Sequence, residues 1–442
     1  MEVFIRIVQL ILSLSILVVA HEFGHYIAAK IFKARVEKFY LFFNPWFSIF
    51  KFKIGETEYG LGWLPLGGYV KIAGMIDESM DKEQMKKPPE PYEFRAKPAW
   101  QRLIIMLGGV IVNVLLAMII YIFLLFTWGD QYLPTSEVNK YGIVVDSLGQ
   151  ELGLQTGDRI LALDSAEVHN FTKIPATLLL DQVKTIQIER EGEKKTLEIP
   201  EGFLSKLAKQ KSPTFINFRI PYVAGRFTET SAAKEAGMEA GDRIIAFNNQ
   251  PMFFFDEYVE SIPKHKGEEV KLTLVRQKDT LDIMVDVPRE GKIGVFPNDS
   301  LNAYFNLAEK HYTLLQAVPA GMVRAYKGIG DYLKQLKLIF SPEVKAYESV
   351  GSFITIYSIF PTSWHWETFW RFTAFLSIML AILNVLPIPA LDGGHVMFVL
   401  YEMISGRKPS DKFMEYAQIV GMVILLAILV FALRNDIVNH LF

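Results

Sequence analysis

The residues best placed for chemistry are His21, Glu22 and His25, which form the pattern H-E-x-x-H. Residues four apart lie on the same face of a helix, one turn or roughly 6 Å apart along its axis. Two imidazoles at this spacing are able to bind one metal ion, and Glu22 beside them is placed as a general base acting on a metal-bound water. A lone H-E-x-x-H also arises by chance, so its surroundings decide what it means.

The motif lies near the end of an apolar run from Val3 to Phe32, within a predicted membrane helix at 1–34. A charged side chain in the middle of such a helix costs roughly 2.5–3.5 kcal/mol on insertion scales, so ionisable groups there indicate function. One metal ion accounts for both histidines and the glutamate. The run is too long for a signal peptide and has no A-x-A cleavage site, which predicts a retained helix.

The composition limits the classes of protein that fit. The chain has 442 residues, 51% of them hydrophobic, with a net charge of −2. These values predict a membrane protein of several domains and argue against a nucleic-acid partner, because no basic face dominates. The absence of cysteine excludes disulfides and thiol catalysis, and it leaves histidine and carboxylate side chains as ligands for any zinc.

Four apolar segments are predicted to span the bilayer, at 1–34, 100–129, 368–397 and 414–434. Lys30, Lys33 and Arg35 lie at the end of the first, and Arg407 and Lys408 follow the third. By the positive-inside rule, these ends are cytoplasmic. The H-E-x-x-H motif then lies in the cytoplasmic half of the membrane, and the region between the second and third spans lies outside.

Residues 35–99 differ from a membrane helix. Polar and apolar residues alternate around Gly/Pro turns from Lys51 to Ile72, which predicts hairpins, and Trp46 and Trp63 suggest contact with the membrane interface. The segment is either a re-entrant β-loop covered by protein or a small cytoplasmic β-ribbon. Residues 77–97 are charged and proline-rich, which predicts a mobile cytoplasmic loop.

The region outside repeats itself. Residues 151–163 recur as 235–247, each copy with a helix that closes on a glycine, then Gly-Asp-Arg and an apolar strand. This spacing resembles tandem PDZ domains of the bacterial, circularly permuted kind, predicted at 138–215 and 216–300. The segment 301–350 is amphipathic and helical, and it either packs on the membrane domain or lies at the interface.

The metal site needs a third protein ligand, since two histidines and a water leave a tetrahedral zinc incomplete. Pro387 and Pro389 should break the third span, and Asp392 follows them in the same half of the membrane as the histidines. His395 is a rival ligand on these grounds.

Together, H-E-x-x-H at His21–His25, N-x-x-P-x-P-x-L-D-G from Asn384, and the PDZ-like domains between them resemble the site-2 protease family of intramembrane zinc metalloproteases. The regulator-of-sigma-E protease branch is the most similar. The resemblance implies that His21, His25 and Asp392 bind zinc and that Glu22 is the catalytic base. For substrate binding, the resemblance and the strand pattern indicate Asn384, Pro387, Pro389, Gly109, Asn113, Tyr59, Gly60 and Leu61. Gly109 and Asn113 also fit simple helix packing.

The predicted fold is a multi-domain membrane protein: a four-span α-helical core, a membrane-associated β-hairpin region and two tandem, mainly β, PDZ-like extracytoplasmic domains. The resemblance implies a bacterial inner-membrane location and hydrolysis of peptide bonds within single-span membrane proteins or remnant signal peptides. It also implies an upstream protease that trims the substrate ectodomain. The PDZ-like domains either recruit substrate tails or exclude bulky substrates, and exclusion is favoured because neither has an obvious G-L-G-F loop. A membrane receptor with a structural zinc is the non-enzymatic alternative.

Overall fold

The computed structural model describes residues 1–65, 67–75, 88–210, 214–342, 344, 347 and 350–441. Much of the charged loop predicted at 77–97 therefore lies outside the described residues, as does Leu66. The chain divides into two compact units. The first comprises Met1–Gly129, His311–Phe340 and Tyr347–Phe442, and the second comprises Asp130–Lys310 and Ser341–Ala346.

Four helices of the first unit are long and apolar enough to span a bilayer: α1 (Glu2–Ile31), α3 (Ala99–Thr127), α12 (Trp366–Val385) and α14 (Asp411–Leu441). The segment predicted as one span at 368–397 is divided, because α12 ends at Val385 and α13 (Asp392–Ser405) begins after a break. That break holds Pro387 and Pro389, which lack the amide donors a continuous helix needs.

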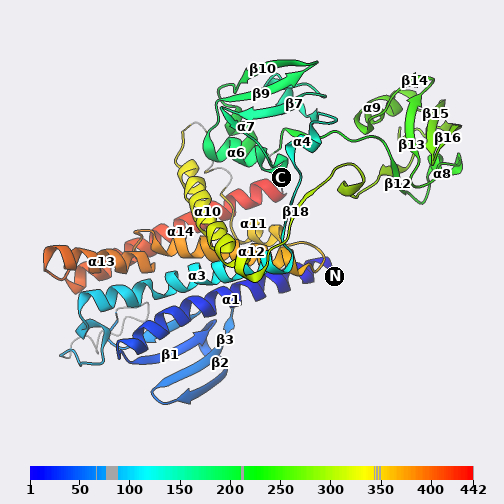
Figure 1. The fold of residues 1–442 in the computed structure, drawn as a ribbon. Helices are drawn as coiled ribbons and strands as arrows, with labels where there is room; N and C mark the ends of the chain where they lie inside the picture. Colours follow the sequence, from blue (N-terminus) through cyan, green and yellow to red (C-terminus); the bar gives the residue numbers. More distant parts are fainter. Residues whose placement is uncertain are drawn as a thin grey trace. The chain divides into compact units, whose positions relative to one another are not determined.

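Small and polar residues hold these helices together, with α3 between α1 and α12 (Figure 1). A Cβ built on Gly24 of α1 would lie 2.2 Å from the carbonyl oxygen of Gly108 in α3, so the two backbones are in direct contact. The hydroxyls of Ser13 in α1 and Thr373 in α12 are hydrogen-bonded at 3.0 Å. The helix that carries H-E-x-x-H is therefore fixed on two sides.

Two further helices complete this unit, α10 (Leu314–Ile339) and the short α11 (Phe353–Ile359). The amphipathic α10 packs against α3 and α12, with its Gly321 against Ile122 and its Tyr332 ring 6.0 Å from Phe375. Of the two alternatives for 301–350, the structure thus shows packing on the membrane helices for residues 314–339.

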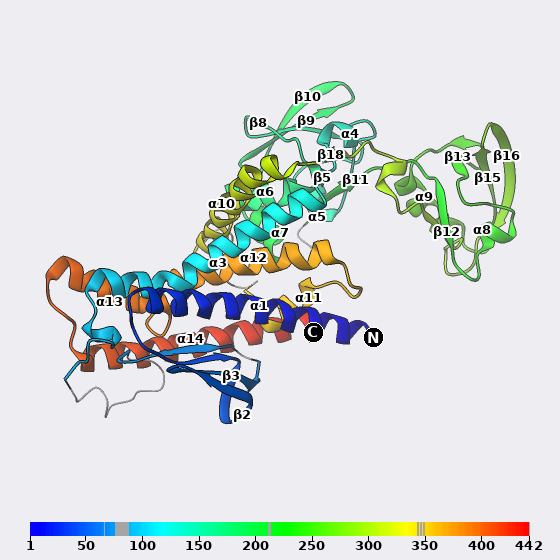
Figure 2. The same ribbon diagram turned by 60° about the horizontal axis from the view of Figure 1, so that its bottom comes forward.

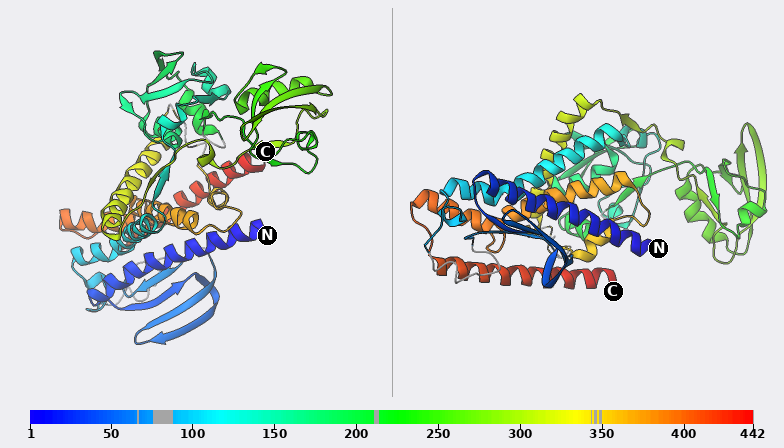
Figure 3. Two further views of the ribbon diagram at one scale, coloured as in Figure 1. Left: turned by 45° about the vertical axis from the view of Figure 1, so that its right-hand side comes forward. Right: turned by 90° about the horizontal axis from the view of Figure 1, so that it is seen from below.

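A four-stranded sheet follows α1: β1 (Val36–Leu41), β2 (Phe43–Ile54), β3 (Thr57–Leu64) and β4 (Tyr69–Ile72), in the order β2-β3-β1-β4. β2 and β3 form an antiparallel hairpin, β3 and β1 are parallel, and β4 is antiparallel to β1. The sheet lies along α1 in both views of Figure 3. A short 3₁₀ turn (Phe94–Ala96) then leads into α3.

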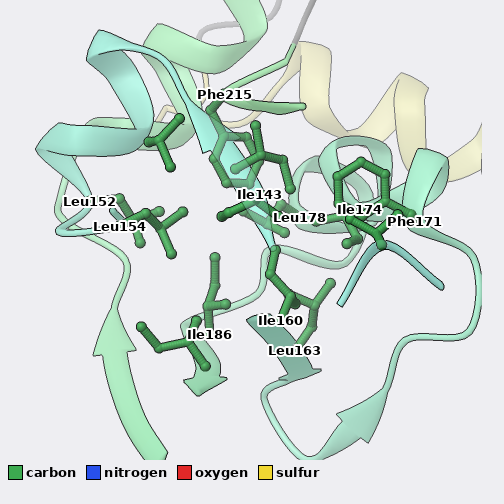
Figure 4. Packing of buried hydrophobic residues seen from close by; sticks show 14 of the residues in the cluster. Ile143, Leu152, Leu154, Ile160, Leu163, Phe171, Ile174, Leu178, Ile186 and Phe215 are labelled. Carbon is green, nitrogen blue, oxygen red and sulfur yellow. The ribbon is translucent and has the colours of Figure 1, made fainter. Parts of the chain in front are cut away.

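The second unit contains two lobes with separate cores. The first has a sheet of order β10-β9-β7-β8 and a pair β11-β6. Its strands are β6 (Ile143–Val145), β7 (Arg159–Leu163), β8 (Ala166–Glu167), β9 (Thr185–Arg190), β10 (Glu193–Glu198) and β11 (Ile216–Phe218). Its helices are α4 (Thr135–Val138), α5 (Ser147–Glu151), α6 (Ile174–Asp181) and α7 (Phe203–Lys209), with a 3₁₀ turn at Phe171–Lys173. Ile143, Ile160 and Leu178 meet in its core (Figure 4).

The second lobe has a sheet of the corresponding order, β14-β13-β15-β16, and a pair β12-β17. Its strands are β12 (Ala224–Phe227), β13 (Arg243–Phe247), β14 (Gln250–Pro251), β15 (Glu269–Arg276), β16 (Asp279–Asp286) and β17 (Val295–Pro297). Its helices are α8 (Ala232–Glu235) and α9 (Phe255–Ser261), with a 3₁₀ turn at Ile262–His265. After a 3₁₀ turn at Leu301–Ala303, β18 (Ala308–Lys310) pairs with β5 (Asp130–Tyr132), so the unit begins and ends on one ladder. Strands β12, β13, β15 and β16 and helices α8 and α9 of this lobe are labelled in Figure 2.

The two sequence repeats occupy equivalent places in the two lobes. In each, the aspartate of Gly-Asp-Arg is buried and pairs with an arginine of the partner strand, Asp158 with Arg190 and Asp242 with Arg276. Gly157 and Gly241 before these aspartates have φ of 99° and 95°, a conformation that favours glycine. The repeat is therefore a repeat of structure as well as of sequence.

Candidate metal centre

Three side chains meet where α1, α3 and the break after α12 come together. His21 and His25 are buried, and their Nε2 atoms are 3.3 Å apart. Oδ2 of Asp392 lies 3.1 Å from Nε2 of His21 and 3.2 Å from Nε2 of His25. The three residues form a potential metal-binding group, so the structure brings together the ligands that the sequence indicated.

The break between α12 and α13 places the aspartate. Ala390 has φ of 79°, and a Cβ built on Gly393 would lie 2.1 Å from the carbonyl oxygen of Leu386. The chain therefore folds back on itself, with Asp392 as the first residue of α13. Gly421 of α14 lies against the carbonyl of Pro389, which holds the turn from the other side.

The donor set fits a tetrahedral zinc ion. Three donors about 2.0–2.2 Å from one zinc lie roughly 3.3 Å apart, close to the separations found here. Nδ1 of His25 is 2.8 Å from the carbonyl oxygen of Ile105, which only accepts, so the proton of the neutral ring is on Nδ1 and the lone pair of Nε2 faces the cluster. Oδ2 of Asp392 is buried and accepts no hydrogen bond within the described ranges. Lone pairs that face one another in this way call for a cation.

Glu22 stands beside the ligands rather than among them. It lines the same cavity as His21 and His25, and the backbone N–H of Val70 in β4 donates a hydrogen bond to its carboxylate. A Cβ on Gly68 would lie 3.5 Å from Cγ of Glu22, so β4 approaches this side chain closely. A carboxylate held next to the metal ligands by a backbone donor is placed for proton transfer.

Helix α3 forms the floor of the site. A Cβ on Gly109 would lie 2.5 Å from Cε1 of His21 and 2.6 Å from Nε2 of His25, so no larger residue fits without displacing the imidazoles. Asn113, one turn further on, lies 3.3 Å from Nδ1 of His21 through its Nδ2. From the other side, Nδ2 of Asn384 lies 3.3 Å from Nε2 of His21.

The cavity at the site has a volume of about 830 Å³. Its lining combines the site residues with β4 and the residues that precede and follow Asp392: Tyr69, Val70, Lys71, Ile72, Ala390, Leu391 and His395. His395 thus borders the cavity but is outside the group of three ligands.

Tyr59, Gly60 and Leu61, indicated by the sequence as substrate-binding residues, lie in β3, which is paired on one side with β2 and on the other with β1. A substrate therefore cannot add as a strand at these three residues. Within residues 51–72, β4 pairs with β1 alone among the described strands, and it borders the cavity.

Two contributors were missed in the sequence. Ile105 contributes only its backbone carbonyl, which no side-chain pattern reveals. The approach of Gly68–Val70 to Glu22 does not follow from the sequence, although the predicted hairpins extend to Ile72. The adjacent glycines were the available signal, since glycine in a strand marks close approach of another group.

The model of the family described as peptidase family M50 matches residues 9–428. This chain belongs to peptidase family M50. A putative zinc metalloprotease of Neisseria meningitidis is 28% identical to this M50 protein, over 98% of each chain. The regulator of sigma-E protease RseP of Salmonella typhimurium is 26% identical, over 96% of this chain and 97% of its own. A putative zinc metalloprotease of Campylobacter jejuni is 27% identical, over 98% of this chain and 93% of its own.

The match confirms the predicted membership of the site-2 protease family and the predicted enzyme class, a metalloprotease. The four membrane-length helices and the β-rich regions of this M50 protein agree with that class. The roles of individual site residues stay predictions.

Proposed function

We propose that this M50 protein is an intramembrane zinc metalloprotease that hydrolyses peptide bonds within the transmembrane segments of membrane proteins. The observation that carries this proposal is the convergence of His21, His25 and Asp392 on a helix long and apolar enough to span a bilayer, with Glu22 next to them. His21, His25 and Asp392 would hold the ion. When bound, zinc polarises a peptide carbonyl and makes a water molecule acidic enough to be a nucleophile near neutral pH.

The chain's own residues supply the proton transfers. Glu22 takes a proton from the attacking water as the new C–O bond forms, and it then passes this proton to the amide nitrogen, so that the scissile C–N bond breaks and the amine leaves. The hydrogen bond from the N–H of Val70 keeps this carboxylate aimed at the cavity.

A substrate helix hides its carbonyls in internal hydrogen bonds, so the enzyme must hold it extended. Among the described strands β4 pairs with β1 alone, and its outer edge borders the same cavity as Glu22, so it is suited to pair with an unwound segment as an additional strand. The amide of Asn384 would capture a freed backbone group, and Pro387 and Pro389 would keep the neighbouring turn rigid.

The two lobes, at 138–215 and 216–300, would be tandem PDZ-like domains outside a bacterial inner membrane, with the zinc site toward the cytoplasmic side. We favour a size filter that admits substrates whose outer domain an upstream protease has already trimmed. Substrates would be single-span proteins such as anti-sigma factors, or remnant signal peptides. Deletion of residues 138–300 should then leave cleavage of short-tailed substrates intact and permit cleavage of bulky ones. Loss of short-tailed cleavage in a folded, zinc-loaded protein would make the lobes recruiters.

Glu22→Gln tests the central proposal. The variant should keep near-stoichiometric zinc and lose cleavage of a transmembrane substrate in proteoliposomes by roughly 10³-fold or more. Glu229→Gln, at an exposed glutamate of the second lobe, is the matched control and should cleave normally. Wild-type cleavage by Glu22→Gln would refute the mechanism, and a zinc-loaded wild type that cuts no membrane substrate would favour a receptor.

The absence of cysteine allows a direct test of the β4 edge. The experiment uses a complex of the substrate with an inactive enzyme. A cysteine that replaces Tyr69 of the enzyme should form a disulfide with one of a series of cysteines placed along the substrate. A cysteine at Gly60, in the interior strand β3, should not. Cross-linking at Gly60 alone would place the substrate on β3 instead.

A further inference from the structure

Asn113 is placed against a metal ligand. Its side chain is fully buried, and its Nδ2 lies 3.3 Å from Nδ1 of His21. Ser377 of α12 donates a hydrogen bond to the backbone carbonyl of Asn113 at 2.8 Å. The residue is thus enclosed by α1 and α12, and a substrate would reach it only if these helices separated.

Packing alone does not account for an amide at this position. Oδ1 of Asn113 is buried and has no hydrogen-bond partner within the described part of the chain. An unsatisfied polar atom in such a place lowers stability, whereas leucine fills a similar volume without that cost. The retained amide therefore needs a second explanation.

The two histidines supply that explanation. A ring nitrogen that binds a metal presents its lone pair, so the other ring nitrogen carries the proton and needs an acceptor. Nδ1 of His25 has such an acceptor in the carbonyl oxygen of Ile105, at 2.8 Å. Nε2 of His21 faces Asp392, so its Nδ1 must donate when the ion is bound, and the side chain in front of Nδ1 is Asn113.

We propose that Asn113 is a positioning residue that accepts a hydrogen bond from Nδ1–H of His21 through its side-chain oxygen. A half-turn of the terminal amide exchanges Oδ1 and Nδ2 in place, so the unpartnered oxygen comes to face the imidazole. Helix α3 then fixes both metal-binding rings, His25 through Ile105 and His21 through Asn113. The inference rests on the metal site of the proposed function.

Asn384, the second asparagine next to His21, illustrates the alternative role, which is contact with a substrate. Its Nδ2 lies 3.3 Å from Nε2 of His21, the nitrogen that the ion would occupy, and the side chain is only partly buried. Metal binding takes that lone pair and releases the amide of Asn384 for a substrate. The two asparagines on His21 thus differ in role: Asn113 orients the ring, and Asn384 is free to contact substrate.

The test measures zinc affinity of the full-length protein in detergent by competition with a chelator. Asn113→Leu should bind zinc about 10–100-fold more weakly, as is typical when the partner of a metal-binding histidine is removed. The visible absorption of the cobalt(II)-substituted variant should also change, because the His21 ring is no longer held. Asn113→Asp keeps an acceptor at the same place and should stay within about threefold of wild type.

Two controls separate this role from packing and substrate binding. Ser377→Ala removes the hydrogen bond to the Asn113 backbone but leaves the amide, so affinity and cobalt spectrum should match wild type. Asn384→Leu should raise KM without weakening zinc binding. Wild-type zinc affinity in Asn113→Leu would overturn the proposal, and a raised KM in that variant would make Asn113 a substrate contact.

Folding failure does not leave the question open. If Asn113→Leu does not fold, Asn113→Asp decides, because a loss of zinc affinity beyond about tenfold in the acceptor-retaining variant would overturn the proposal. Unchanged zinc affinity of Asn113→Asp, together with a shifted ¹⁵N resonance of Nδ1 in His21, would support the proposal. A wild-type protein that binds no zinc at all would instead contradict the proposed function, so the two failures are distinct.

Discussion

The lobes and the metal centre each hold aspartate oxygens away from solvent, but the two places satisfy these oxygens in different ways. In the lobes, Asp158 accepts from Arg190 at 2.7 Å and from the N–H of Gln155 at 2.8 Å, and Asp242 accepts correspondingly from Arg276 and Glu239. In the membrane unit, Oδ2 of Asp392 faces the two imidazole nitrogens, and none of the described residues donates to it.

This difference separates a structural carboxylate from a ligand. A buried carboxylate whose oxygens all receive donors is complete and holds a turn in place. A buried carboxylate whose oxygen faces lone pairs is incomplete until a cation joins it, and its cost is retained because the site has a function. The same residue type therefore stabilises the lobes and prepares the membrane unit for metal.

Among the variants that test this comparison, Asp392→Asn should show the largest effect. Zinc affinity should fall by at least about 100-fold, because an amide is a far weaker ligand than a carboxylate, while the protein stays monodisperse in detergent. His395→Ala, which alters a cavity residue outside the ligand group, is the control and should keep near-stoichiometric zinc. The zinc content of both purified variants tests this prediction. A larger loss of zinc in His395→Ala than in Asp392→Asn would make His395 the ligand.

Gly109→Ala should have the next largest effect. The added methyl would lie 2.5 Å from Cε1 of His21 and 2.6 Å from Nε2 of His25, so the rings must shift. Because the rings are displaced from their present orientation, whatever the direction, zinc affinity should fall by roughly tenfold or more. Gly330→Ala adds the same methyl where no atom lies within 4 Å and should leave zinc binding unchanged. Full zinc affinity in Gly109→Ala would show that α3 shifts and makes room for the added methyl group.

The sequence predicts the membrane unit well wherever the signal is local. The pairing of His21 and His25 as candidate ligands follows from helix spacing, and the break at Pro387 and Pro389 follows from proline chemistry. Asp392 needed the family resemblance, because spacing alone left His395 open. Tertiary contacts bring these segments together, and no single segment of the sequence reveals them. One example is the contact between Gly24 and Gly108, which brings α3 under the imidazoles.

The sheet shows why the remainder was harder. The alternation of polar and apolar residues predicts strands, but not the order in which they pair. The local pattern predicts the hairpin of β2 and β3, but it does not predict that β1 runs parallel to β3 and occupies its other edge at Tyr59. That long-range pairing moves the edge to β4, and only the folded chain brings the N–H of Val70 to Glu22.

Asp158→Asn tests the structural side of the comparison and should have a moderate effect. The change leaves Arg190 without its counter-ion in a largely buried pair, so hydrogen exchange in β7 and β9 should accelerate roughly 10–100-fold. Zinc content should not change. Asp299→Asn, in the exposed pair with Arg226, should alter exchange less than about fivefold. Loss of zinc in Asp158→Asn would contradict the division of roles.

The smallest expected effect is the acid dependence of the second lobe. Burial raises the pKa of Asp242, but hydrogen bonds from Arg276 and from the N–H of Glu239 outweigh it and hold the pKa below the ordinary 3.8. A carboxyl whose pKa is lower in the folded state contributes stability above its unfolded pKa, and this contribution is lost as the pH falls through the folded pKa. Protection of β13 and β15 against hydrogen exchange, corrected for the intrinsic rate, should stay level from pH 7 to about pH 5 and then decline below 3.8. Asp242→Asn, which has no proton to gain there, should begin with weaker protection and lose that part of the decline. An equally steep decline in both proteins would assign the acid response to other carboxyls and remove Asp242 from the comparison.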